Sequence, residues 1–210
     1  MARSTPRHGP RDERGVLAAR ILQQARASFA EDGYAGTTVR AVARAAGVDP
    51  ALVYHYYGSK EGLLDAATSP PRDFLDEIVA AWQAPQGELG EQLVRRMLRN
   101  WENPAHEPVL RAILQIAGHE PAMREKLRTI IERSMMGPAE QALGEPERLA
   151  RSGLIATQFL GLAFMRYVWK IEPIATMTED ELVAGIAPTI QRYLDGDIGA
   201  AATARAVTGA

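Results

Sequence analysis

Apolar residues recur at helical spacing along most of the chain. From Val16 onward, they return every three or four residues, which is the pattern of amphipathic helices packed against a core. A first helix is expected to end at Gly33, and short helices are expected over 38–45, 50–56 and 60–67. No segment shows the strict alternation of a convincing strand. The pattern therefore predicts an all-α fold.

The second and third of these segments are joined by a tight turn at Gly47-Val48. Thr37 or Thr38 is expected to cap the helix before the turn and Asp49 the helix after it, since their side-chain oxygens accept backbone N–H groups that lack a partner. Two short helices joined in this way form a helix-turn-helix. Its second helix is expected to bury Leu52 or Val53 and to present to solvent Pro50, Ala51, Tyr54 and His55.

A double proline at Ser69-Pro70-Pro71 interrupts the periodicity and marks a boundary. Beyond it the chain predicts further helices, among them a long one from Glu145-Pro146 to about Lys170. A final helix, 178–194, begins at a Thr178 and Glu181 capping box. We expect a disordered basic arm over 1–13, a three-helix domain over 14–68, a larger helical domain over 69–196 and a disordered tail over 197–210.

Charge is distributed unevenly along the chain. The 210 residues are 46% hydrophobic and 24% charged, with a formal net charge of −2, which is ordinary for a globular protein. The first 60 residues, however, carry nine Arg or Lys against five Asp or Glu. A basic head on an acidic remainder suits one domain that faces a polyanion such as DNA.

Several classes of protein are disfavoured by what the sequence lacks. There are no cysteines, so disulfides and thiolate zinc sites are excluded. No apolar run is long enough for a membrane span and no secretory signal is visible, so we expect a cytoplasmic protein without membrane contact. The four histidines show no metal-ligand spacing and no nucleotide or hydrolase motif occurs, so we expect no metal, no cofactor and no enzyme activity.

Two rival interpretations stay open at this level. One is a helical dimer whose N-terminal unit binds another protein, and the other is an enzyme built on a helical bundle. Titrating salt against duplex DNA separates the first rival from a DNA-binding protein, because phosphate contacts weaken steeply with salt. The second rival lacks a nucleophile–base pair or paired carboxylates.

The segment from residue 21 to residue 64 resembles the DNA-binding domain of the TetR family of repressors. The resemblance rests on Ile21-Leu22, Ala25, Phe29, Gly33-Tyr34, Thr37-Thr38-Val39-Arg40, Ala43, Ala46-Gly47-Val48 and the run Leu52-Val53-Tyr54-His55-Tyr56-Tyr57-Gly58-Ser59-Lys60-Glu61-Gly62-Leu63-Leu64. It implies a homodimer that binds a palindromic operator, with a helical C-terminal domain for ligand binding and dimerisation. One departure concerns the end of the recognition helix, where the family usually has Tyr-Tyr-His-aromatic and this chain has Tyr-His-Tyr-Tyr over 54–57.

The resemblance and the residue chemistry together predict a ligand-responsive transcriptional repressor released from double-stranded DNA by an unknown small-molecule effector. In such an interface, phosphate contacts hold the protein in register on the DNA and base-edge contacts read the sequence. The candidate DNA-binding residues are Thr38, Arg40, Pro50, Ala51, Tyr54, His55, Tyr56 and Lys60.

The C-terminal domain offers candidates for two further surfaces. Polar or aromatic residues on apolar helix faces are expected to line an effector pocket: Trp101, Arg111, Gln115, His119, Gln158, Phe159 and Arg166. The last two helices are the expected dimer interface, since paired helices from two chains form a four-helix bundle. The interface candidates are Leu154, Ile155, Gly161, Leu162, Tyr167, Ile186 and Ile190.

Overall fold

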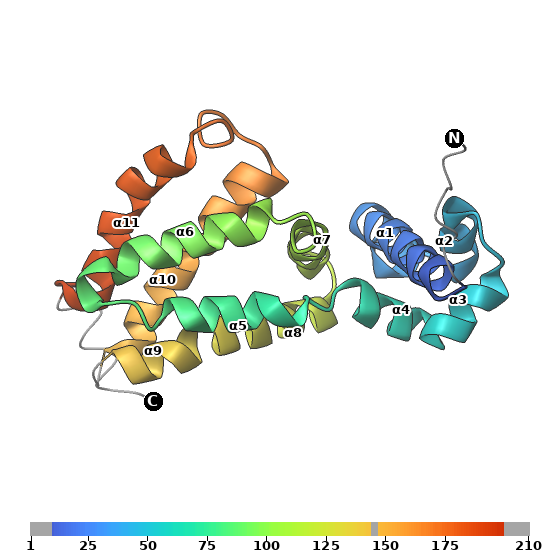
Figure 1. Cartoon of the computed structure of the whole chain (residues 1–210), viewed down its shortest axis with the longest axis horizontal. Helices are drawn as coiled ribbons and strands as arrows, with labels where there is room; N and C mark the ends of the chain where they lie inside the picture. Colours follow the sequence, from blue (N-terminus) through green and yellow to red (C-terminus); the bar gives the residue numbers. More distant parts are fainter. Residues whose placement is uncertain (1–9, 144–146, 200–210) are drawn as a thin grey trace, which may run out of the picture. The chain divides into compact units, whose positions relative to one another are not determined.

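The expected all-α fold is confirmed. The computed structural model describes residues 10–143 and 147–199, and within these ranges it contains helices and no β-strand (Figure 1). The chain divides into two compact units, residues 1–69 and residues 70–210. Each unit has its own hydrophobic core and is described by itself below.

Over residues 10–69, the N-terminal unit contains four helices: α1 (Pro10–Gly36), α2 (Val39–Ala46), α3 (Pro50–Tyr57) and α4 (Lys60–Ala67). The regular geometry of α1 is broken at Gly33, which has a φ of 69° and a ψ of 179°. Ile21, Ala25 and Phe29 on α1 are fully buried, as the apolar period predicts. The Arg26 Nε also donates a 2.7 Å hydrogen bond to the Ala67 carbonyl, which joins α1 to the end of α4.

The start of α1 corrects one expectation about the basic arm. The helix begins at Pro10, so the last four residues of the arm expected over 1–13 are helical. Proline suits a first helical position because it lacks the N–H that has no helical partner there. The remainder of the arm lies outside the described residues. The same is true of 200–210 in the expected tail, whereas 197–199 have no regular secondary structure.

The C-terminal unit is built from seven α-helices within its described residues: α5 (Arg72–Ala81), α6 (Leu89–Glu102), α7 (Glu107–Ala117), α8 (Pro121–Ile131), α9 (Gly137–Ala142), α10 (Arg148–Ala163) and α11 (Glu179–Asp195). A short 3-10 helix, η1 (Gln86–Glu88), precedes α6. The π-helical turns η2 (Glu132–Met136) and η3 (Phe164–Val168) follow α8 and α10. The long helix expected over 145–170 is therefore α10 continued by η3.

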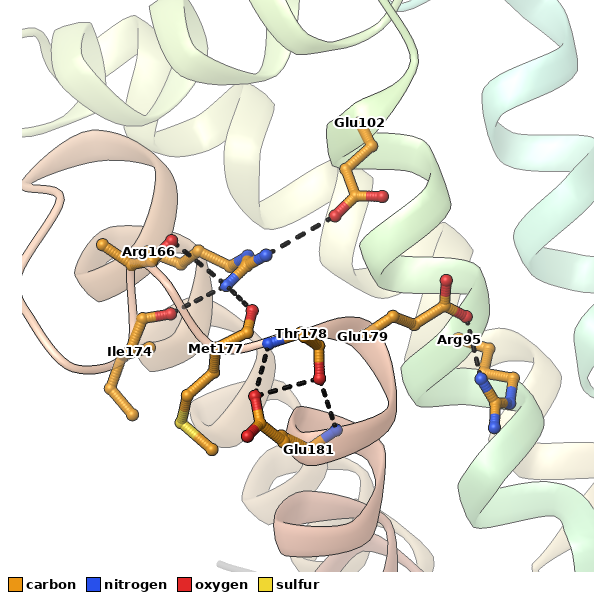
Figure 2. Close-up of polar contacts among 9 residues, drawn as sticks. Arg95, Glu102, Arg166, Ile174, Met177, Thr178, Glu179 and Glu181 are labelled. Atoms are coloured by element: carbon orange, nitrogen blue, oxygen red, sulfur yellow. Dashed lines mark hydrogen bonds and ion pairs between the residues drawn. The ribbon is translucent and has the colours of Figure 1, made fainter.

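Helices α6 and α11 lie against each other in this unit (Figure 1). A Cβ atom at Gly90 would lie 2.9 Å from the Ala187 carbonyl oxygen, so only glycine allows this approach of the two backbones. The Gly90 N–H donates a 2.8 Å hydrogen bond to the Gln191 side chain on α11. The predicted capping box at the start of α11 is also confirmed, with Thr178 and Glu181 each accepting from the other's backbone N–H (Figure 2).

Candidate DNA interface and effector cavity

The helix-turn-helix is held by side-chain caps at both of its helices. Thr38 caps α2 by accepting a hydrogen bond from the Ala41 N–H at 3.1 Å. Gly47 ends α2 in the left-handed conformation, with a φ of 64° and a ψ of 40°, which a residue with a side chain rarely adopts. Asp49 then caps α3 by accepting from the Ala51 N–H at 2.7 Å. These local bonds set the direction in which α3 leaves the turn.

One face of α3 packs inward and the other faces solvent. Of the two candidates for the inner position, Val53 is 1% exposed and Leu52 is half-buried. Ala51, Tyr54 and His55 lie on the exposed face, and the Tyr54 side chain is 51% exposed. The helix therefore presents a polar and aromatic surface that its own unit does not use.

The remaining DNA-contact candidates lie around this helix. Arg40 is exposed on α2, and Pro50 is half-buried at the start of α3. Tyr56 is half-buried and packs edge-on against His55, with the ring centroids 5.7 Å apart. The Lys60 ammonium lies 4.3 Å from the centre of the Tyr34 ring, which holds the lysine at the start of α4.

Two residues that the sequence reasoning did not select also bear on this surface. Arg44 is exposed in the last turn of α2, one helical turn beyond Arg40, and this i, i+4 spacing is the signal that could have identified it. Tyr57 donates a 3.1 Å hydrogen bond from its hydroxyl to the Ala18 carbonyl, so it ties the end of α3 to α1. Burial raises the pKa of the Tyr57 hydroxyl, and the ring stays neutral at neutral pH.

The C-terminal unit contains a mostly apolar cavity of about 110 Å³. Its walls come from α5, α6, α7, α8, η2 and α10. Two of the predicted pocket residues, Trp101 and Phe159, line it, and the outer face of Trp101 stacks on Tyr167 with ring centroids 4.9 Å apart. Further aromatic lining residues are Phe74 and Trp82.

Five predicted pocket residues do not line this cavity. Arg111 is used in an ion pair with Glu107 on its own helix, one turn away. His119 is exposed just beyond the end of α7, and Gln115 and Gln158 are half-buried outside the cavity wall. Polar residues of these helices thus bind a partner on their own helix or face solvent, instead of lining the cavity.

Arg166 is the fifth of these residues, and it supports a loop instead (Figure 2). Its guanidinium donates hydrogen bonds to the carbonyls of Ile174 at 2.8 Å and Met177 at 2.7 Å. A carboxylate oxygen of Glu102 lies 3.7 Å from its other terminal nitrogen. The side chain therefore fixes the segment that leads into α11.

Asn100 lines the cavity and was missed by the sequence reasoning. It lies on the apolar stripe of α6, one turn after Met97 and next to Trp101, and it is 2% exposed. A polar residue inside an apolar helical stripe is the signal that identifies it.

The predicted dimer residues fall into two groups. Ile155 and Ile190 have no exposed surface, and Leu162 is 6% exposed in the same core. These three pack inside their own chain because they lie on the inward face of α10 or α11, so they do not themselves offer contact surface. The other four are exposed or half-buried: Leu154, Gly161, Tyr167 and Ile186.

Two other kinds of site are absent from the described residues. None of the helices in these ranges has the length and apolar character that crossing a bilayer requires. No group of three or more His, Asp or Glu side chains is arranged there to hold a metal ion.

A two-helix motif with a capped, solvent-facing second helix defines a helix-turn-helix DNA-binding protein. Comparison with known families agrees with this class. The model for bacterial regulatory proteins of the tetR family matches residues 21–67, and the model for the tetracyclin repressor-like C-terminal domain matches residues 87–194. The second match covers more than half of the chain, so the chain belongs to the TetR family of DNA-binding transcriptional regulators.

Individual relatives show the same family. A TetR-family regulator from Streptomyces coelicolor A3 is 30% identical, with a TM-score of 0.59 over 90% of this chain and 99% of that one. The regulator BetI from Burkholderia thailandensis is 28% identical over 49% of this chain and 62% of its own length, so the match spans less than two thirds of that relative. NalD from Pseudomonas aeruginosa, a secondary repressor of a multidrug efflux pump, shares the fold at 17% identity, a TM-score of 0.62, and coverage of 87% of this chain and 98% of NalD.

Proposed function

We propose that this regulator binds a palindromic operator as a homodimer and is released from it by a small-molecule effector, so that it acts as a repressor. The observation that carries the proposal is α3 itself. Its caps and the buried Val53 hold it in place, while Ala51, Tyr54 and His55 face solvent. An exposed helix that is fixed by the rest of its unit is what insertion into a major groove requires.

The proposed DNA contacts divide into phosphate contacts and base contacts. Arg40, Arg44 and Lys60 supply positive charge to phosphates. The hydroxyl of Thr38 and the polar tips of Tyr54, His55 and Tyr56 supply further hydrogen bonds to the backbone. Pro50 and Ala51 at the start of α3 offer small apolar surfaces to a thymine methyl group. Asp49 acts as a cap, since a carboxylate facing phosphates is repelled.

The proposed dimer forms through the outer faces of α10 and α11. A Cβ atom added at Gly153, Gly161 or Gly185 would meet no atom within 4 Å, so these faces leave room for the close approach of a second copy. Leu154 on α10 and Ile186 on α11 supply apolar surface there. Tyr167 lies on η3, directly after α10, and is half-buried. Paired helices from two chains then make a four-helix bundle.

The effector is proposed to enter the cavity of the C-terminal unit and to favour a dimer arrangement that no longer fits the operator. A ligand shifts this equilibrium only by the difference between its affinities for the two arrangements. Binding to DNA and binding to the effector are therefore expected to weaken each other.

The experiment that tests the proposal is selection of bound duplexes from a random pool. We expect enrichment of a palindrome with half-sites about one helical turn, roughly 34–36 Å, or more apart. Enrichment of an asymmetric site argues against the dimer, and absence of any enrichment argues against the operator.

Mobility shifts on the selected duplex then test the assigned phosphate contacts. Arg40→Ala and Arg44→Ala are each expected to weaken binding and to reduce the slope of log affinity against log salt by about one. Arg99→Ala removes the same charge from an exposed position in the C-terminal unit and serves as the matched control. Unchanged affinity in an α2 variant removes that arginine from the DNA-facing surface.

A further inference from the structure

The cavity of the C-terminal unit contains an unused hydrogen-bond donor. Asn100 lines the cavity and is 2% exposed, and its Nδ2 has no hydrogen-bond partner among the described residues. Buried amide groups are nearly always paired, because burial removes their hydrogen bonds to water. An unpaired donor in a cavity wall indicates an occupant that accepts its hydrogen bond.

The orientation of this amide is set by a buried histidine. His106 has no exposed surface, and its Nδ1 lies 3.2 Å from the Asn100 Oδ1. An amide oxygen only accepts hydrogen bonds, so this contact requires the tautomer with the proton on Nδ1. Because that oxygen is engaged, the amide nitrogen is the atom left for an occupant. The His106 ring is held in turn by an edge-on contact with Phe74, with ring centroids 5.8 Å apart.

Most of the rest of the wall is apolar. Four aromatic side chains line the cavity: Phe74, Trp82, Trp101 and Phe159. The indole N–H of Trp82 donates to the Ser134 carbonyl at 3.0 Å. Arg96 is the charged side chain among the lining residues, and it donates to a Glu77 carboxylate oxygen at 2.8 Å. A charged occupant would therefore be buried without a free counter-ion, which is strongly unfavourable.

The size of the cavity limits the occupant further. Its volume of about 110 Å³ is smaller than that of an engineered apolar cavity of roughly 150 Å³ that binds benzene in another protein, so it has room for about one ring. We infer that the effector is an uncharged, mostly apolar molecule with about one ring, whose carbonyl or ether oxygen accepts a hydrogen bond from Asn100 Nδ2. This inference rests on the proposed function only in taking the cavity as the effector site.

Three small aromatic probes test the inference without DNA. Acetophenone carries the acceptor, ethylbenzene has nearly the same shape without it, and benzoate carries a charge. Binding is measured by quenching of intrinsic tryptophan fluorescence, since Trp82 and Trp101 line the cavity, and is checked by calorimetry. The measured quantity is the ratio of acetophenone affinity to ethylbenzene affinity, which cancels the general effect of a substitution on apolar binding.

Asn100→Leu is expected to lower this ratio about tenfold, because it removes the donor while keeping the size of the side chain. Gln92→Leu, at an exposed position of the same helix, is the matched control and is expected to leave the ratio unchanged. If Asn100→Leu does not fold, Asn100→Ala removes the same amide and carries the comparison. His106 is a positioning residue, so His106→Leu is expected to lower the ratio while ethylbenzene affinity stays unchanged.

Three results overturn the inference: equal ratios in the wild type and the Asn100 variant, tighter binding of benzoate than of acetophenone, or no binding of either neutral probe. All three are measured on the protein alone. Operator selection and mobility shifts report the proposed function separately, so failure of one is distinguishable from failure of the other.

Discussion

The two units differ in how far apart along the chain their functional residues lie. The candidate DNA surface comes from residues 38–60, and its caps join residues two or three positions apart. The cavity draws its walls from Phe74 to Ala163, on six helical elements. Local hydrogen bonds therefore determine the first site, whereas the second exists only after the whole unit has packed. Substitutions that affect only one unit at a time test this difference.

The largest effect is expected from Phe29→Ala in the core of the N-terminal unit. Phe29 is fully buried, and its truncation is expected to cost about 3–5 kcal/mol through lost apolar contacts and a cavity. Hydrogen exchange followed by mass spectrometry should show faster exchange over 10–69 and loss of DNA binding, while acetophenone binding persists. Val16→Ala, at a position 62% exposed on the same helix, is the control. Loss of probe binding in Phe29→Ala would show that the units do not fold independently.

A smaller loss, confined to the other unit, is expected from Gly90→Ala. The added Cβ would lie 2.9 Å from backbone atoms of α11, and overpacking of this kind costs about 1–3 kcal/mol. The higher helix propensity of alanine offsets up to about 1 kcal/mol of this cost. Thermal unfolding measures the change, and Gly87→Ala, where an added Cβ meets nothing within 4 Å, is the control. Equal effects at the two glycines would contradict the close approach of α6 and α11.

Asp49→Ala tests how far local hydrogen bonds alone hold α3 in place. Loss of this cap is expected to destabilise the N-terminal unit by about 0.5–2 kcal/mol and to weaken operator binding. Asp49→Asn keeps the capping oxygen and removes a negative charge next to the proposed phosphate contacts, so we expect it to bind DNA more tightly than the wild type. Mobility shifts at matched salt compare the three proteins. Weakened binding in Asp49→Asn would assign the carboxylate a role beyond capping.

The smallest effect concerns pH and the contact between α4 and the end of α1. The hydrogen bond donated by the Tyr34 hydroxyl is the main cause that lowers the pKa of Glu61 to about 2. Since the folded-state pKa lies below the usual 4.5, the ionised carboxylate stabilises the folded state fully above about pH 4.5 and progressively less as the pH falls toward 2. The difference in Tm between wild type and Tyr34→Phe should therefore be larger at pH 7 than at pH 3. A constant difference would mean that the hydroxyl acts independently of Glu61 ionisation.

The sequence predictions were more accurate for the locally determined helices and caps than for the cavity. The helices expected over 38–45, 50–56 and 60–67 are observed at 39–46, 50–57 and 60–67. Thr38, Asp49 and Thr178 cap the helices that they were expected to cap. Caps and turns depend on residues a few positions apart, so a linear pattern contains the information needed.

The cavity was predicted less well, for a physical reason. Trp101 and Phe159 were identified because large aromatic residues on an apolar stripe pack inward. Arg111 and Arg166 do not line this cavity, because their guanidinium groups make hydrogen bonds elsewhere, to Glu107 and to the Ile174 and Met177 carbonyls. Asn100 was missed because its partner, His106, lies next to it only when the turn between α6 and α7 has formed.

By itself, the sequence determined the all-α class, the helix-turn-helix with its caps, and the family to which the chain belongs. The tertiary structure alone decided which polar residues meet a cavity and which apolar residues of α10 and α11 stay inside their own chain. Helical periodicity specifies which face of a helix is apolar, but the neighbour that covers that face depends on how all the helices of the unit pack together.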